Sequence, residues 1–225
     1  MQTERKIYLG LALVGLVGTW SYNIRFFLED KPGMAFVSEN LATPANLSLS
    51  LDIILMTSLL FLWMAREARR YGIRHLWAYL LGSLGVAICV AFPLFLQARR
   101  KALESRAEIR EPTRLTALYP LVSGAAFVII FIHRWQFAER GGTFEQFLGD
   151  LFRTPATSSI TIDWVILGIV LITFAAFELR RLRYAGFRRF VLMNVFGLAV
   201  GMPWILRAID VREEPARTPA SGEQT

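Results

Sequence analysis

Six long apolar stretches, separated by clusters of arginine, constrain this chain more than any other feature. They run over residues 7–28, 48–65, 76–96, 115–133, 159–177 and 190–206. A helix that crosses a hydrocarbon core about 30 Å thick needs about 20 predominantly apolar residues. The stretches therefore predict an all-α membrane protein with six transmembrane helices.

The composition agrees with a membrane protein. Hydrophobic residues make up 54% of the chain and charged residues 19%, whereas a soluble domain carries about 25% charged residues. The net charge of +7 comes from basic residues that flank the apolar stretches, which is typical of anchoring beside anionic lipid headgroups. We therefore expect the lipid bilayer as a partner and no nucleic acid.

Few side chains are available for a metal or cofactor. Cys89 is the single cysteine, and His75 and His133 are the two histidines, so a cysteine cluster or a histidine-built metal site is excluded. No P-loop, dinucleotide-binding fingerprint or hydrolase motif is present. The expectation is that the protein uses no cofactor and no metal, and the sequence sets no oligomeric state.

An internal repeat organises the chain. The segment TPANLSLSLD over residues 43–52 recurs as TPATSSITID over residues 154–163, and EARR over residues 67–70 recurs as ELRR over residues 178–181. Both matches have the same shift of 111 residues, and nine of 22 compared positions are identical. Such self-similarity indicates two copies of one structural unit.

The repeat continues into the third apolar stretch of each half, where Pro93 matches Pro203 at a shift of 110. This predicts a first three-helix repeat over residues 1–110, a second over residues 111–210, and a disordered tail over residues 211–225. A proline inside a helix removes a backbone hydrogen bond. We therefore expect a bend in the third helix of each repeat.

Three crossings per repeat would place the second copy in the membrane upside down. The distribution of basic residues fits such an inversion, because 12 of them fall on the amino-terminal side and 13 on the other. An inverted repeat from a dual-topology ancestor would lack a charge bias in this way. If the basic link over residues 98–114 sets the orientation, that link faces the cytoplasm and both termini lie outside.

Four acidic residues near the ends of predicted helices are the candidate site residues. They are Asp52, Glu67, Asp163 and Glu178, taken as proton donors or ligand contacts. Inversion would bring Asp52 level with Glu178, and Glu67 level with Asp163. Two close carboxyl groups push their pKa values apart, which is one way to make a proton donor at neutral pH.

Structural roles for the same acids stay open. Asp52 and Asp163 are also placed to cap their own helices and oppose the helix dipole. Glu67 and Glu178 are each three residues before an arginine, Arg70 or Arg181, a spacing that favours an ion pair on one helix.

Each half resembles a family of small three-helix bacterial membrane proteins that is known only as a domain of unknown function. The resemblance rests on Asp52, on EARR over residues 67–70 and on FPLFL over residues 92–96. The second half keeps Asp163 and ELRR but departs at residues 202–206, which read MPWIL. The resemblance implies a multi-pass protein of the bacterial inner membrane and supplies no activity.

Three functions stay open. Inverted repeats favour binding or transport of a small amphipathic molecule or lipid at the repeat interface. The alternative is an isoprenoid cyclase, because the chain is similar in type to the integral-membrane terpene and lycopene cyclases, in which intramembrane acids protonate the substrate. The Pro-x-Glu motif of the lycopene cyclases has no counterpart here. A purely structural membrane protein is the third possibility.

Overall fold

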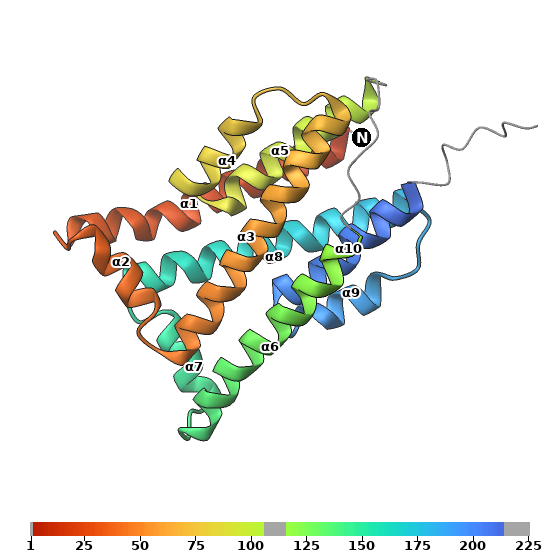
Figure 1. The fold of residues 1–225 in the computed structure, drawn as a ribbon. Helices are drawn as coiled ribbons and strands as arrows, with labels where there is room; N and C mark the ends of the chain where they lie inside the picture. The colour runs from red at the N-terminus through yellow and green to blue at the C-terminus, as the bar shows by residue number, and fades with distance from the viewer. Residues whose placement is uncertain (1, 106–115, 214–225) are drawn as a thin grey trace, which may run out of the picture.

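The computed structural model describes residues 2–105 and 116–213, which form ten α-helices. The first repeat contains α1 (Gln2–Leu28), α2 (Gly33–Asn40), α3 (Pro44–Tyr71), α4 (Leu76–Gly85) and α5 (Ile88–Glu104). The second repeat contains α6 (Leu118–Glu139), α7 (Phe144–Leu151), α8 (Pro155–Arg181), α9 (Phe187–Asn194) and α10 (Leu198–Glu213). The two sets correspond one to one, so the duplication extends over all five helices (Figure 1).

The repeated Thr-Pro-Ala motif starts the long central helix of each repeat. Thr43 accepts a hydrogen bond from the backbone amide of Asn46, and Thr154 accepts one from that of Thr157. A threonine N-cap followed by proline is a favoured way to begin a helix. Both helices therefore start four residues before the predicted apolar stretches.

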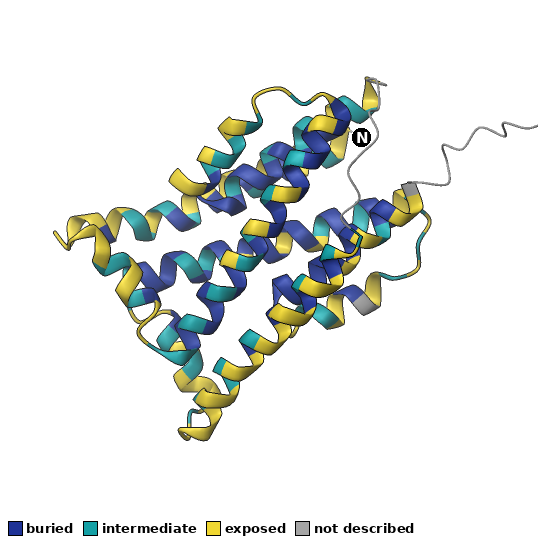
Figure 2. Cartoon of the chain, viewed as in Figure 1, coloured by how far each residue is buried: buried dark blue, intermediate teal, exposed yellow. Residues whose placement is uncertain are grey.

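Four helices of the described chain, α1, α3, α6 and α8, are long and apolar enough to cross a membrane. The apolar windows of α3 and α8 are 56% and 50% buried, against 22% and 17% for α1 and α6. The more buried helices α3 and α8 therefore form the centre of the bundle, and the less buried α1 and α6 form its flanks (Figure 2). The exposed faces of α1 and α6 carry large apolar residues such as Val17 and Leu121, as expected of surfaces that face lipid.

The third apolar stretch of each repeat is broken into two helices. In the first repeat the break lies at Val86 and Ala87, between α4 and α5. The ring centroids of Tyr79 and Phe95 are 5.6 Å apart, and Gly82 lies against Ala91, so α5 runs back along α4. The pair is a helical hairpin, and α9 with α10 forms its counterpart (Figure 1).

These hairpins contradict the predicted inversion. Each hairpin returns toward the end of the bundle from which it started, so a repeat crosses the bundle twice and the two repeats run in the same direction. The carboxyl-terminal ends of α3 and α8 meet at one arginine, Arg99, whereas inversion would place them at opposite ends. The described part of the chain thus has four helices of spanning length, whereas the sequence predicted six. Apolar length alone does not distinguish a spanning helix from a hairpin of two shorter ones.

The two prolines and parts of the predicted polar segments lie within helices. Pro93 and Pro203 lie inside α5 and α10, after the breaks and not at them. The predicted link over residues 98–114 begins as helix, because α5 continues to Glu104, and α10 includes the first three residues of the predicted tail. The remaining parts of the link and tail predictions lie largely outside the described residues.

Basic residues are distributed very unequally between the two ends of the bundle. We call the end where α1 and α6 begin and α3, α5, α8 and α10 finish the basic end. In the described chain, the basic residues near the opposite end, where α2 and α7 lie (Figure 1), are Arg25, Lys31, Arg134, Arg140 and Arg153. The other described lysines and arginines lie toward the basic end. In the inverted arrangement the basic residues would be divided almost equally between the two ends. In the parallel arrangement most of the described lysines and arginines lie at one end.

Candidate functional site

Asp52 lies inside α3 and binds the start of α10 from the other repeat. Its carboxylate accepts hydrogen bonds from the backbone amides of Leu198 and Ala199, each at 2.8 Å, and from Nε1 of Trp164 at 2.7 Å. The first amides of a helix have no acceptor within the helix, and a negative charge is favourable at its positive end. Fully buried Asp52 therefore caps a helix that begins inside the bundle.

Gly197 allows this close approach. Its φ of +147° lies in the region that favours glycine, and a Cβ built there would be 2.9 Å from Cδ1 of Ile130 and 3.1 Å from Oδ1 of Asp52. The carbonyl of Val195, just before the break, accepts a hydrogen bond from Nη1 of Arg134 at 3.4 Å. Side chains of the protein thus satisfy backbone groups on both sides of the break.

Asp163 occupies the equivalent position in the second repeat. Its Oδ1 accepts a hydrogen bond from the backbone amide of Cys89, at the start of α5, at 2.9 Å. Sγ of Cys89 lies 3.5 Å from Oγ1 of Thr19. A Cβ built on Gly15 would be 2.8 Å from the same sulfur, so α1 packs directly against this break.

The two aspartates are therefore reciprocal caps. Asp52 of the first repeat caps α10 of the second, and Asp163 of the second repeat caps α5 of the first. The alternative that the aspartates cap their own helices is wrong, because Thr43 caps α3 and Thr154 caps α8. The aspartates are caps, but of helices in the other repeat. The exchange ties the two repeats together at the breaks of both hairpins.

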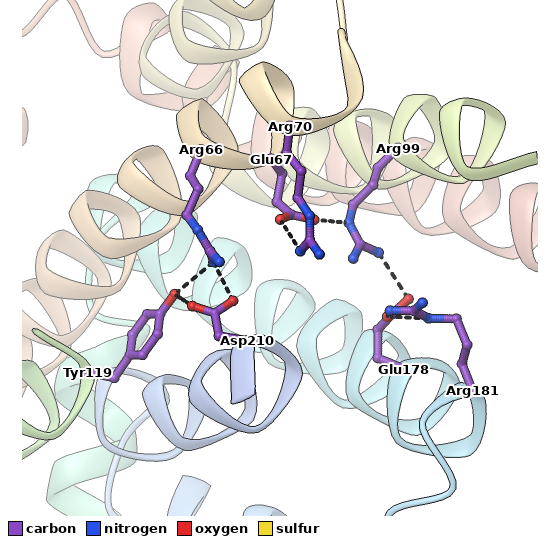
Figure 3. A network of polar contacts seen from close by, with 8 residues as sticks. All are labelled: Arg66, Glu67, Arg70, Arg99, Tyr119, Glu178, Arg181 and Asp210. Carbon is purple, nitrogen blue, oxygen red and sulfur yellow. Dashed lines mark hydrogen bonds and ion pairs between the residues drawn. The ribbon is translucent and has the colours of Figure 1, made fainter. Parts of the chain in front are cut away.

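The two glutamates converge on Arg99 of α5 (Figure 3). Nε of Arg99 is 2.5 Å from Oε2 of Glu67, and Nη1 of Arg99 is 3.0 Å from Oε1 of Glu178. Arg70 and Arg181 flank them, with Nη1 of Arg70 3.5 Å from Oε1 of Glu67 and Nε of Arg181 2.8 Å from Oε2 of Glu178. The predicted pairing of each glutamate with the arginine three residues later is confirmed.

Arg99 is held by aromatic rings as well as by carboxylates. Its guanidinium carbon lies 5.3 Å from the ring centroid of Trp63, 5.5 Å from that of Tyr71 and 5.9 Å from that of Phe174. Only 1% of Arg99 is exposed. A desolvated guanidinium over aromatic faces gains cation–π attraction in addition to its ion pairs. This centre joins α3, α5 and α8.

A second buried group lies beside the first and joins α3, α6 and α10. Asp210 accepts a hydrogen bond from Oη of Tyr119 at 2.8 Å and forms an ion pair with Arg66 (Figure 3). At the equivalent place in the other half, Arg100 forms an ion pair with Glu4 at 2.5 Å. Both groups lie at the basic end of the bundle.

The predicted acid pairs do not form. Asp52 lies with the start of α10, whereas Glu178 lies with Arg99, and Glu67 is likewise separated from Asp163. Among the described residues, no group of three or more His, Cys, Asp or Glu side chains is placed to hold a metal ion. The proton-donor role of the four acids stays a prediction without its expected partners.

Sequence reasoning did not point to Arg99 or Asp210 as site residues, because Arg99 falls in the segment interpreted as a polar link and Asp210 follows the last predicted apolar stretch. A signal for Arg99 is present in the sequence. Arg99 follows Phe92, Phe95 and Leu96 at the three- and four-residue spacing of one helix face. Continuing the helix beyond the apolar stretch would have placed the arginine on the buried face.

Comparison with known proteins identifies the family. The family described as "Protein of unknown function DUF2834" matches residues 7–101 and again residues 118–208. The chain belongs to this family. The two matched segments correspond to the two structural repeats, which confirms the resemblance seen in each half. No curated protein and no solved structure gives a significant match.

Proposed function

We propose that this protein binds or transports a small amphipathic molecule or lipid at the interface between its two repeats. The observation that supports this most is the pair of helices that begin inside the bundle, each capped by an aspartate of the other repeat. In many transporters, broken helices of this kind meet at the repeat interface, and their ends contact the substrate.

The chemistry of the breaks suits a ligand with one polar and one apolar part. Irregular backbone at membrane depth is tolerated where protein buries it or where it lines a cavity. Here Asp52 and Trp164 provide polar groups next to α10, and Thr19 and Asp163 provide them next to α5. A polar ligand group that takes over one of these hydrogen bonds would loosen a hairpin from its cap. Binding and hairpin movement would then be linked.

The alternative cyclase activity has less support from the geometry. A cyclase of this kind needs an acid whose proton faces a cavity large enough for an isoprenoid. Each of the four carboxylates instead accepts hydrogen bonds or ion pairs from backbone amides, arginines or a tryptophan. We therefore place binding or transport before catalysis.

We further propose an orientation in which the basic end faces the cytoplasm. Cytoplasmic segments carry an excess of lysine and arginine, and the bias toward the basic end is strong once the repeats run in parallel. Both chain termini and the link between the repeats would then be cytoplasmic, in a multi-pass protein of the bacterial inner membrane. This reverses the orientation of the termini expected from the inverted arrangement.

Cysteine labelling tests this topology. We expect single cysteines at Gln2 and Ser105 to react only after the cells are permeabilised, and cysteines at Asp30 and Gly141 to react in intact cells. Cys89 is buried and is replaced by alanine in all variants. Opposite accessibility of Gln2 and Ser105 would contradict the parallel repeats, since both lie at the basic end.

Analysis of bound molecules tests the binding function. The protein is purified from membranes in detergent, and co-purified lipids and isoprenoids are identified by mass spectrometry. We expect one amphipathic species enriched over the bulk membrane, and a severalfold lower amount with Asp52→Asn and Asp163→Asn. Asp30→Asn is the matched control, because this acid is exposed and far from the breaks. Bulk membrane composition in all four proteins would contradict binding and favour the structural alternative.

A further inference from the structure

A groove at the end of α8 differs from the repeat interface in position and in chemistry. It has a volume of about 390 Å³ and lies where α8 ends and the chain turns into α9. Leu179, Tyr184 and Phe187 line it with apolar surface, and Arg180 and Arg183 line it with positive charge. We call it the α8–α9 groove. It lies at the basic end of the bundle.

The two arginines of this groove have side chains that are available to a ligand. Within the described chain, the side chains of Arg180 and Arg183 make no hydrogen bond or ion pair, and both residues are exposed. Their neighbour Arg181, in contrast, pairs with Glu178 at 2.6 Å. Nearby, the guanidinium of Arg212 lies 4.7 Å from the ring centroid of Tyr184. Two arginines therefore line this small apolar groove, and a third lies over the ring of Tyr184, one of its lining residues.

The backbone at Arg183 indicates that this arginine has a role beyond folding. Its φ is +51°, in the left-handed region, which is sterically unfavourable for a residue with a Cβ. The equivalent position at the end of α3 is Gly72, with a φ of +63°, the residue that suits a helix end of this type. The second repeat thus keeps the same backbone turn but carries an arginine where glycine is favourable.

The turn itself is the same in both repeats. The amide of Tyr184 donates to the carbonyl of Leu179 at 2.9 Å, as the amide of Ile73 donates to that of Ala68 at 2.9 Å. The arginine at this place is therefore not needed to form the turn. An arginine held in a backbone conformation that glycine adopts without steric cost, at a turn that does not need the arginine, is a sign of function.

We propose that the α8–α9 groove binds the phosphate of an anionic phospholipid, with an acyl chain against Leu179 and Phe187. Arginine is suited to bidentate contacts with phosphate, and the apolar lining suits hydrocarbon. Lipid headgroups lie at the ends of a transmembrane bundle, where this groove is. The proposal requires only that the protein is embedded in a membrane, and it is independent of the ligand at the repeat interface.

The experiment measures lipid affinity for the purified, intact protein in detergent. Phosphatidylglycerol with two oleoyl chains is titrated and binding is followed by native mass spectrometry, with phosphatidylcholine of the same chains as the neutral lipid. We expect phosphatidylglycerol to bind at least tenfold more tightly than phosphatidylcholine. Arg183→Gly and Arg180→Gln should each weaken phosphatidylglycerol binding about tenfold.

Arg183→Gly separates binding from folding. Because glycine suits the left-handed turn, this variant should unfold at the same temperature as the wild type or higher, while it loses affinity for the lipid. Arg69→Gln is the matched control, since Arg69 is the exposed counterpart of Arg180 in the first repeat. Its affinity should stay within twofold of the wild type.

Three outcomes would overturn the proposal. The first is wild-type affinity of Arg183→Gly and Arg180→Gln. The second is an equal loss in Arg69→Gln, which would indicate attraction to the basic surface in general. The third is displacement of the lipid by millimolar inorganic phosphate, which would indicate a site for free phosphate and not for a lipid.

Discussion

The two pairs of repeated acids have become different structures, although each pair arose from the same duplication. Asp52 and Asp163 keep separate, equivalent partners, each at the start of a helix in the other repeat. Glu67 and Glu178 instead share one partner, Arg99. A contact away from the point where the two repeats meet can occur twice, once for each repeat, as the aspartate caps do. The two glutamates meet at one point, and only one bridging arginine fits between them.

The sequence differs between the repeats where this limit applies. The positions in α10 that correspond to Arg99 and Arg100 are Ile209 and Asp210. A second arginine at the position of Ile209 would bring two like charges toward the same carboxylates. Asp210 binds Arg66 instead, and the position equivalent to Arg66 in the second repeat is Phe177. The aspartate caps are thus the same in both repeats. Around Arg99 the two repeats carry different residues, because one arginine serves both glutamates.

Removal of Arg99, the shared cation, should lower the free energy of unfolding more than any other change in this comparison. Arg99→Met leaves Glu67 and Glu178 buried without the cation that bridges them, and breaking a buried ion pair in this way costs about 3–5 kcal/mol. We expect a loss of that size in the free energy of unfolding, measured by denaturant titration in mixed micelles. Arg99→Lys should lie between wild type and Arg99→Met, because an ammonium group lacks the planar fork of a guanidinium.

Lys101→Met is the control for this prediction. Lys101 lies on the same helix and is exposed, so its replacement removes the same charge without unpairing a buried carboxylate. A loss of less than about 1 kcal/mol for Arg99→Met, which is the usual range for exposed ion pairs, would contradict the role of Arg99 as the shared partner.

The next effect concerns the aspartate caps. Asp52→Asn replaces the carboxylate that accepts hydrogen bonds from the amides of Leu198 and Ala199, and leaving a buried donor unsatisfied costs about 1–3 kcal/mol. We expect the free energy of unfolding to fall by an amount in this range. The fall should be smaller for Asp163→Asn, because in the described chain Asp163 accepts a hydrogen bond from one backbone amide of α5, that of Cys89. Both are measured as free energies of unfolding in the same micelles. A larger loss for Asp163→Asn would contradict the order of the two caps.

Double-mutant cycles then separate the two classes of acid. Asp52→Asn and Glu178→Gln should be additive within about 0.5 kcal/mol, because they contact different partners. Glu67→Gln and Glu178→Gln should be coupled by about 0.5–3 kcal/mol, because both contact Arg99. The pairing expected from inversion predicts the reverse pattern, so the cycles decide between the two arrangements.

The smallest effect is expected at the prolines. Pro93 and Pro203 lie inside α5 and α10, after the breaks, so replacing either with alanine restores one helix amide and leaves the hairpin in place. We expect each change to alter the free energy of unfolding by about 1 kcal/mol or less and to alter ligand binding more. Large and equal losses of stability in both variants would instead show that the prolines are packing elements.

Several features could be predicted from the sequence because they depend on local composition. The duplication and the helical membrane class follow from the repeat and the apolar length. The start of α3 and α8 at Thr-Pro-Ala has an equally local signal in its capping chemistry, but the apolar stretches placed it four residues too late. The pairing of Glu67 with Arg70 likewise depends only on the three-residue spacing on one helix.

Other features depended on contacts between residues far apart in the chain. Whether residues 76–96 cross the membrane once or fold back depends on whether another helix can satisfy the amides exposed at a break, and Asp163 does so from 74 residues away. That hairpin sets the number of crossings, and the number of crossings sets whether the repeats are parallel. The parallel arrangement, in turn, brings Glu67 and Glu178 to Arg99. The sequence by itself determined which residues are repeated and helical, whereas only the tertiary structure decided which of them meet, because partners across a bundle leave no periodic signal along the chain.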